Sequence, residues 1–111
     1  MADVRGNIRD FKRAQKALME NNEEAMSEFS DFMEVVLEEN HLDLKTKELI
    51  ALTNGITARC KYCIDLHTQK ALDAGCTRGE ILEAAFVAIM MGGGPALTYI
   101  AELKKALDEF E

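Results

Sequence analysis

Two cysteines, a histidine and a glutamate have the clearest capacity for chemistry in this chain. The spacing runs Glu48, eleven residues, Cys60, two residues, Cys63, three residues, His67. Residues three and four apart lie on the same face of a helix, so Cys60, Cys63 and His67 would point the same way. The Cα atoms of the two cysteines would lie about 5 Å apart, which a disulfide accepts. The sequence therefore predicts a redox-capable pair with a base beside it.

Each of the two thiols has its own reason to ionise. Cys60 falls at the expected start of a helix, where the dipole and the free N–H groups favour a thiolate. Cys63 has the imidazole of His67 one turn away as a proton acceptor. These residues leave open which cysteine would attack a substrate first.

Glu48 reaches the same site if the helices before and after Arg59 form an antiparallel hairpin. It lies eleven residues before that turn, and His67 lies eight residues after it. At about 1.5 Å of rise per residue the two positions differ by only about 4–5 Å along the hairpin axis. A carboxylate spans this gap directly or through a water. We therefore predict a relay in which Glu48 orients His67 and His67 activates the thiol of Cys63.

Zinc binding is the main alternative, because two Cys, one His and one Glu are four possible ligands. Zinc-binding CxxC pairs usually lie on turns that wrap the ion, and a second ligand pair is missing here. We therefore expect no metal and no cofactor, and keep a zinc-stabilised oligomer as an alternative. Cys76 and His41 lie outside the motif and are expected to be a small buried apolar residue and a rim residue.

The composition suits one acidic globular domain spanning residues 1–111. Apolar residues make up 48% of the chain, there is a single proline, and the formal net charge is -7. Such a charge disfavours binding to nucleic acids and anionic membranes, which attract clustered Lys and Arg. The chain shows no signal-peptide pattern, and its longest apolar run, 84–91, is too short to span a membrane. We expect a cytoplasmic protein, where three cysteines indicate chemistry more than structural disulfides.

Hydrophobic periodicity predicts an all-α fold without strands. Asn22 and Asp43 are suitable N-caps, Thr77 and Glu80 form a capping-box sequence, and Gly75 suits the position after a helix. About six helices are expected, over residues 3–20, 23–39, 44–58, 60–74, 78–91 and 95–109.

Two of these helices carry expectations about their surroundings. The helix at 23–39 has the cleanest amphipathic pattern and is expected to face the core. The helix at 78–91 is apolar nearly all round, which is typical of a helix buried on most sides. In so short a chain, this indicates a subunit interface.

The Glu48, Cys60, Cys63, His67 signature resembles that of the alkylhydroperoxidase D-like branch of the carboxymuconolactone decarboxylase family. The similarity covers about residues 30–108, including the helix start at 47–52 and the segment 80–93. It implies an all-α, AhpD-like helical bundle that assembles into trimers or hexamers. It also implies a dithiol that reduces hydroperoxides or exchanges with small disulfides, is re-reduced by a thiol partner, and receives protons through Glu48 and His67.

Two departures from the family pattern bear on function. Characterised alkylhydroperoxidases of this kind have a further histidine directly before the second cysteine, where this chain has Tyr62. Dithiol–disulfide exchange without peroxidase activity is therefore an alternative function. The decarboxylases that name the family generally lack the cysteine pair, so lactone decarboxylation is not expected.

Overall fold

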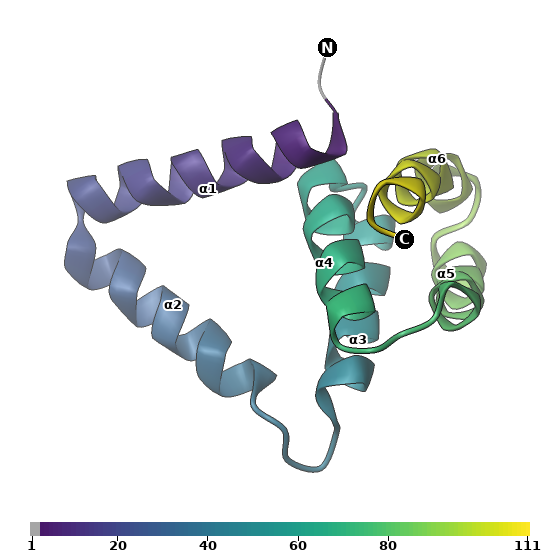
Figure 1. The fold of residues 1–111 in the computed structure, drawn as a ribbon, viewed down its shortest axis with the longest axis horizontal. Coiled ribbons are helices and arrows are strands. Elements are labelled where there is room, and N and C mark those ends of the chain that lie inside the picture. Colours follow the sequence, from purple (N-terminus) through teal and green to yellow (C-terminus); the bar gives the residue numbers. More distant parts are fainter. Residues whose placement is uncertain (1–2) are drawn as a thin grey trace.

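The computed structural model describes residues 3–111, and over that range the chain forms six α-helices and no strand (Figure 1). The all-α prediction is thus confirmed. Each predicted boundary lies within two residues of the observed one. The helices are α1 (Val4–Asn21), α2 (Glu23–Leu37), α3 (Leu44–Thr57), α4 (Lys61–Asp73), α5 (Arg78–Gly92) and α6 (Gly94–Phe110).

The helix ends follow from the capping residues in the sequence. The Asp43 carboxylate accepts the backbone N–H of Thr46 at 2.8 Å, and the Asn22 side chain accepts that of Ala25 at 3.1 Å. Thr77 and Glu80 make both bonds of a capping box. Gly75 adopts a left-handed φ of 99° just after α4, as a glycine does at little steric cost. These local predictions are confirmed.

Helices α3 to α6 form the main core. Helix α3 packs against α4 and α5, and α4 packs against α6. The buried side chains are aliphatic and small, which lets the helices approach closely. The main cluster includes Leu52, Ile56, Ile64, Ala71, Ile81, Ala85, Ala88, Ala96, Leu103 and Leu107.

Helix α1 contacts this core only through its first turns. Val4 and Ile8 are buried in a small second cluster with Ala106, and Leu66 and Phe110 pack around them. Beyond these first turns, α1 extends away from the core. Figure 1 shows α1, α2 and the α3–α4 pair as the three sides of an open triangle.

The expectation that α2 faces the core is wrong. None of its residues is buried, and Phe29 and Phe32 are 55% and 64% exposed. The reason is that α1 holds α2 away from α4, so the apolar stripe of α2 borders an open space. The far end of α2 is tied to α3, because the Lys47 ammonium donates to the carbonyl of Val36 at 2.7 Å and also to that of Glu38.

Helix α5 is half buried in the single chain, and the expectation that most of its sides are covered depends on the subunit interface predicted for it. Ile81, Ala85 and Ala88 face the core. Phe86, Met90 and Met91 are 71%, 74% and 75% exposed. The subunit interface predicted for this helix therefore stays a prediction. None of the helices within residues 3–111 is long and apolar enough to cross a membrane.

Candidate active site

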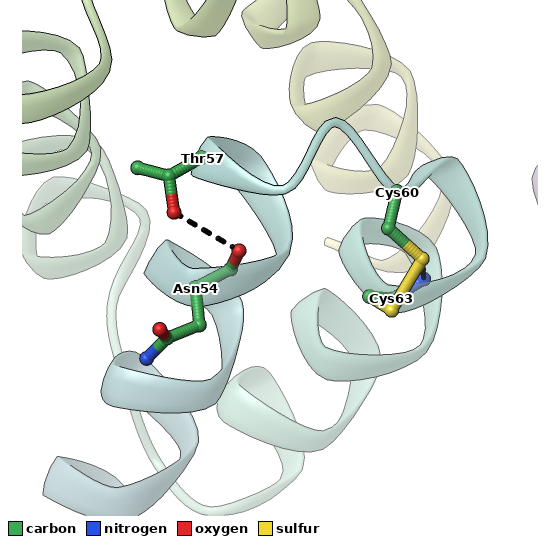
Figure 2. Close-up of a disulfide and its surroundings, with 4 residues drawn as sticks. All are labelled: Asn54, Thr57, Cys60 and Cys63. Carbon is green, nitrogen blue, oxygen red and sulfur yellow. Dashed lines mark hydrogen bonds between the residues drawn. A yellow bond between two sulfur atoms is a disulfide. The ribbon is translucent and has the colours of Figure 1, made fainter.

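The turn between α3 and α4 brings the chain back on itself. At the end of α3 the Thr57 hydroxyl donates to the Asn54 carbonyl at 3.1 Å (Figure 2). Arg59 then adopts a left-handed φ of 56°, and the N–H of Cys60 donates back to the Gly55 carbonyl at 3.0 Å. This closed turn orients α4 antiparallel to α3, so that residues 48 and 67 meet.

Cys60 and Cys63 are joined by a disulfide, with Cα atoms 5.3 Å apart (Figure 2). Cys60 is the N-cap of α4, one residue before the helix begins, and Cys63 lies in the first turn. The sulfur of Cys60 accepts the backbone N–H of Cys63 at 3.2 Å. Both sulfurs therefore sit at the positive end of the α4 dipole, which stabilises a thiolate when the disulfide is reduced.

Glu48 and His67 meet across the hairpin. Oε1 of Glu48 lies 2.7 Å from Nδ1 of His67. The Glu48 residue is only 2% exposed, whereas the His67 side chain is 22% exposed. An ionised carboxylate only accepts hydrogen bonds, so the proton of a neutral His67 lies on Nδ1. Nε2 is then left free to accept a proton.

An open groove of about 820 Å³ lies between α1, α2 and α4. Tyr62, Cys63 and His67 form part of its α4 wall, whereas Glu48 is buried behind His67. A molecule that enters the groove from solvent therefore meets Cys63 and His67 on this wall. Its other walls are mainly apolar and include Phe11, Phe32, Met33, Val36, Leu37 and Leu66.

Gly55 positions the site in a way that sequence reasoning missed. A Cβ built on Gly55 would lie 2.9 Å from the Cβ of Cys63. Only glycine lets α3 pass this close to the first turn of α4. The signal in the sequence was a glycine on the same stripe of α3 as Glu48, two turns further along.

A buried polar pair near the site was also missed. Asp65 is 0% exposed, and its Oδ2 accepts the Asn7 side-chain amide at 2.9 Å. Burial, together with the neighbouring Glu102 carboxyl, raises the pKa of Asp65 to about 7. Within residues 3–111, the buried side-chain oxygens without a hydrogen-bond partner are Asn7 Oδ1 and Asp65 Oδ1. A protonated Asp65 would turn one of its two carboxyl oxygens into a hydrogen-bond donor.

The residues set apart from the motif behave as packing and surface residues. Cys76 is 4% exposed, and burial raises the pKa of its thiol, which disfavours the reactive thiolate. His41 is exposed. Across the described part of the chain, no group of three or more His, Cys, Asp or Glu side chains is arranged to hold a metal ion.

The fold and the site together define a class of protein. Its members are all-helical, with a cysteine pair at the start of one helix and a carboxylate–histidine pair beside it. The family model of the carboxymuconolactone decarboxylase family matches residues 23–106, and this chain belongs to that family. The cysteine pair agrees with the alkylhydroperoxidase D-like branch expected from the sequence.

Solved structures and curated relatives support the assignment. An apo protein of this family from Legionella pneumophila is 34% identical, with a TM-score of 0.92 and 96% of each chain covered. A family member from Thermotoga maritima, for which a role in the antioxidative response has been suggested, is 25% identical with a TM-score of 0.82, covering 92% of this chain and 87% of that one. An uncharacterized protein of Cupriavidus necator is 32% identical over 98% of this chain and 94% of its own length.

Proposed function

We propose that this protein is a thiol-dependent oxidoreductase that reduces organic hydroperoxides with Cys60 and Cys63. One observation carries the proposal. Cys63, the second cysteine of a pair at disulfide distance, lies on the same groove wall as His67, and His67 is hydrogen-bonded to the buried Glu48. The suggested antioxidative role of the Thermotoga maritima relative is in line with it.

In the first step, His67 accepts the proton of the Cys63 thiol at Nε2. The thiolate attacks the terminal peroxide oxygen, the O–O bond breaks, and Cys63 becomes a sulfenic acid. The leaving alkoxide takes the proton held by His67 and departs as an alcohol. Glu48 stabilises the imidazolium in the interval, because its carboxylate lies 2.7 Å from Nδ1. We assign the first attack on the peroxide to Cys63 because Cys63 borders the groove together with His67.

In the second step, the Cys60 thiolate attacks the Cys63 sulfur. The S–S bond forms, the S–O bond of the sulfenic acid breaks, and the hydroxide leaves as water with the proton that the Cys60 thiol has released. Two thiols and one hydroperoxide have then become one disulfide, one alcohol and one water. A cellular dithiol restores the pair by exchange and is itself oxidised to a disulfide. The N–H of Cys63, which points at the Cys60 sulfur, stabilises the Cys60 thiolate as nucleophile here and as leaving group during re-reduction.

A second candidate function is dithiol–disulfide exchange with a small disulfide as substrate. The observation that favours it is Tyr62, which stands on the groove wall directly before Cys63 where the characterised peroxidases have a histidine. A phenol has a pKa near 10 and is a poor proton acceptor at neutral pH. Fast turnover of a hydroperoxide at catalytic protein concentrations would exclude this candidate.

The test is a count of free thiols on fully reduced, anaerobic protein before and after a small excess of an organic hydroperoxide. We expect a loss of two thiols per chain, mapped by mass spectrometry to Cys60 and Cys63. Cys60→Ser and Cys63→Ser variants should lose turnover, and Cys76→Ser serves as the matched control with full activity. Turnover by the Cys60→Ser/Cys63→Ser double variant would overturn the proposal.

A further inference from the structure

Cationic side chains gather in a second groove, of about 410 Å³, beside α1. They are Arg5, Arg9, Lys12, Arg13 and Lys16, and the described residues that line this basic groove include no acid. Arg5 is paired with Glu109, and within residues 3–111 no ion pair involves the other four cations. All five cations are exposed. Such a cluster in an otherwise acidic chain favours a bound anion.

The basic groove adjoins the groove of Cys63 and His67. Lys12 on α1 and Gln69 on α4 border both grooves, and so mark the junction between them. Gln69 lies six residues after Cys63. At about 1.5 Å of rise per residue, the junction is about 9 Å from Cys63 along the axis of α4. A single molecule with an anionic end at the junction can therefore reach Cys63 with another of its atoms.

The walls near Cys63 suit a hydrocarbon chain. Leu66 lies between Cys63 and Gln69 in the sequence of α4 and lines the same groove, and Phe11 lines it from α1. On the α2 side, Phe32 and Val36 line the groove and are 64% and 47% exposed in the single chain. Covering such apolar surface with an aliphatic chain removes it from water, which is favourable.

The charges around the groove fix the direction in which an anionic chain would lie. Glu34 and Glu38 line it near the end of α2, and Asp73 lines it at the end of α4. Lys70 lies one turn before Asp73 and offsets only one of these three charges. An anionic end is therefore repelled from the ends of α2 and α4 and attracted to the junction at Lys12.

We propose that the substrate of the Cys60–Cys63 pair is a long-chain fatty acid hydroperoxide. Its carboxylate lies among Arg9, Lys12 and Lys16, and its chain follows the apolar walls to Cys63. An extended chain advances about 1.2 Å per bond, so the distance of about 9 Å corresponds to about eight bonds and places the peroxide near the ninth carbon.

The reaction is the one given for the proposed function, on which this inference rests. Two thiols and the fatty acid hydroperoxide become one disulfide, one hydroxy fatty acid and one water. The carboxylate takes no part in the bonds that form or break. Its contribution is to hold the peroxide beside the thiol, which raises the rate through proximity.

The experiment compares two substrates that differ only in charge. One is linoleic acid hydroperoxide with the peroxide on its ninth carbon, and the other is its methyl ester. Fully reduced wild-type protein is mixed with each below the concentration at which micelles form, and stopped-flow kinetics gives the second-order rate constant of Cys60–Cys63 oxidation. We expect the acid to react about tenfold faster than the ester, or more, because its carboxylate gains charge-assisted hydrogen bonds.

Neutral variants test the basic groove itself. Arg9→Gln/Lys12→Gln/Lys16→Gln removes three charges and keeps long polar side chains, and we expect the acid-to-ester ratio of rate constants to fall to about one. Lys105→Gln is the matched control, because Lys105 is exposed on α6 far along the chain from both grooves, and it should keep the wild-type ratio. Circular dichroism checks that the variants are folded.

A third substrate, tert-butyl hydroperoxide, separates failure of this inference from failure of the proposed function. It has neither a long chain nor a charge, so it reports the chemistry of the thiols alone. If it oxidises Cys60 and Cys63 while the wild-type acid-to-ester ratio is about one, or while the triple variant keeps the wild-type ratio, this inference is overturned and the peroxidase function stands. Reaction with tert-butyl hydroperoxide alone would mean that another occupant fills the groove, and would overturn it too. If none of the three substrates oxidises the pair, both proposals fail.

Discussion

At the scale of single residues, the site depends on a difference in burial between hydrogen-bonded partners. Glu48 is almost fully buried, whereas the His67 side chain it binds reaches the groove. A buried carboxylate hydrogen-bonded to Nδ1 fixes the imidazole ring and leaves Nε2 outside that bond. In the mechanism we propose, His67 is the base and Glu48 is the residue that positions it.

Replacing Glu48 by glutamine tests that assignment. Glu48→Gln keeps the shape and a hydrogen-bond acceptor but removes the charge that stabilises the imidazolium. We expect the rate of Cys60–Cys63 oxidation by a hydroperoxide to fall by about a hundredfold, the lower range for a lost general base. Stopped-flow kinetics on reduced protein measures the rate, and Glu83→Gln, at an exposed position of α5, is the control. Equal rates for the two variants would remove Glu48 from the relay.

At the scale of elements, the distance between α3 and α4 determines where the cysteines lie. The two helices cross at Gly55 and Cys63, and the atoms in the way of an added Cβ are the Cβ and backbone of Cys63, which have little freedom to move. The crossing point is therefore coupled directly to the disulfide.

Gly55→Ala should destabilise the protein, although alanine is the better helix former. The intrinsic gain of about 1 kcal/mol is outweighed by overpacking, which costs about 1–3 kcal/mol. We expect a net loss of about 1 kcal/mol in the free energy of unfolding by urea. Gly79→Ala is the matched control, because its new Cβ would meet only the Thr77 hydroxyl at 3.8 Å and should be neutral or stabilising. A Gly55→Ala protein as stable as Gly79→Ala would contradict this account of the crossing.

The Asn7–Asp65 hydrogen bond joins the first turns of α1 to α4, and the burial of Asp65 should make the stability of the fold depend on pH. The pKa of Asp65 is raised from 3.8 to about 7 in the folded chain, by burial first and by Glu102 second, while Lys61 and Asn7 oppose the shift. Between these two values the folded chain holds a proton that the unfolded chain has released. The contribution of this proton to the free energy of unfolding is thus complete below pH 3.8. It is lost as pH rises through 7, by roughly 1 kcal/mol per pH unit.

Asp65→Asn isolates this effect, because an amide mimics the protonated acid at every pH. Wild type and variant should have similar free energies of unfolding at pH 4, and the variant should be the more stable at pH 8. Urea unfolding across this range measures the difference in free energy of unfolding between wild type and variant. The effects of the acidic residues that both chains share cancel in this difference. Parallel pH profiles would contradict a raised pKa of Asp65 in the folded chain.

At the scale of the whole molecule, two uncovered apolar surfaces point to assembly. One is on α2, and the other is the exposed face of α5 with Phe86, Met90 and Met91. A chain of this size gains stability by burying such surfaces between subunits. The exposed face of α5 is therefore available for the subunit contact predicted for this helix.

Phe86→Glu/Met90→Glu should therefore reduce the mass of the assembly without loss of helix content. Both side chains are more than two-thirds exposed, so the single chain loses little packing. Light scattering coupled to gel filtration gives the mass, and Lys105→Glu, an exposed change on α6, controls for added negative charge. An assembly of unchanged mass would exclude α5 from the interface.

Much of the site was predictable because its geometry is local. Cys60, Cys63 and His67 share one helix face through their spacing alone, and their hairpin partner Glu48 follows from one turn at Arg59. Gly55 and the Asn7–Asp65 pair were not predictable in this way. Each depends on which helices touch, and Asn7 and Asp65 lie 58 positions apart.

The sequence by itself determined the six helices, their caps and the order of the four site residues, because hydrogen bonds and side-chain contacts within a few residues decide these features. Only the tertiary structure decided what each apolar stripe would cover. Helix α2 has the best amphipathic pattern and yet no buried residue, because α1 carries it away from α4. Burial depends on the surface that other elements leave open, and a helix's own periodicity does not contain that information.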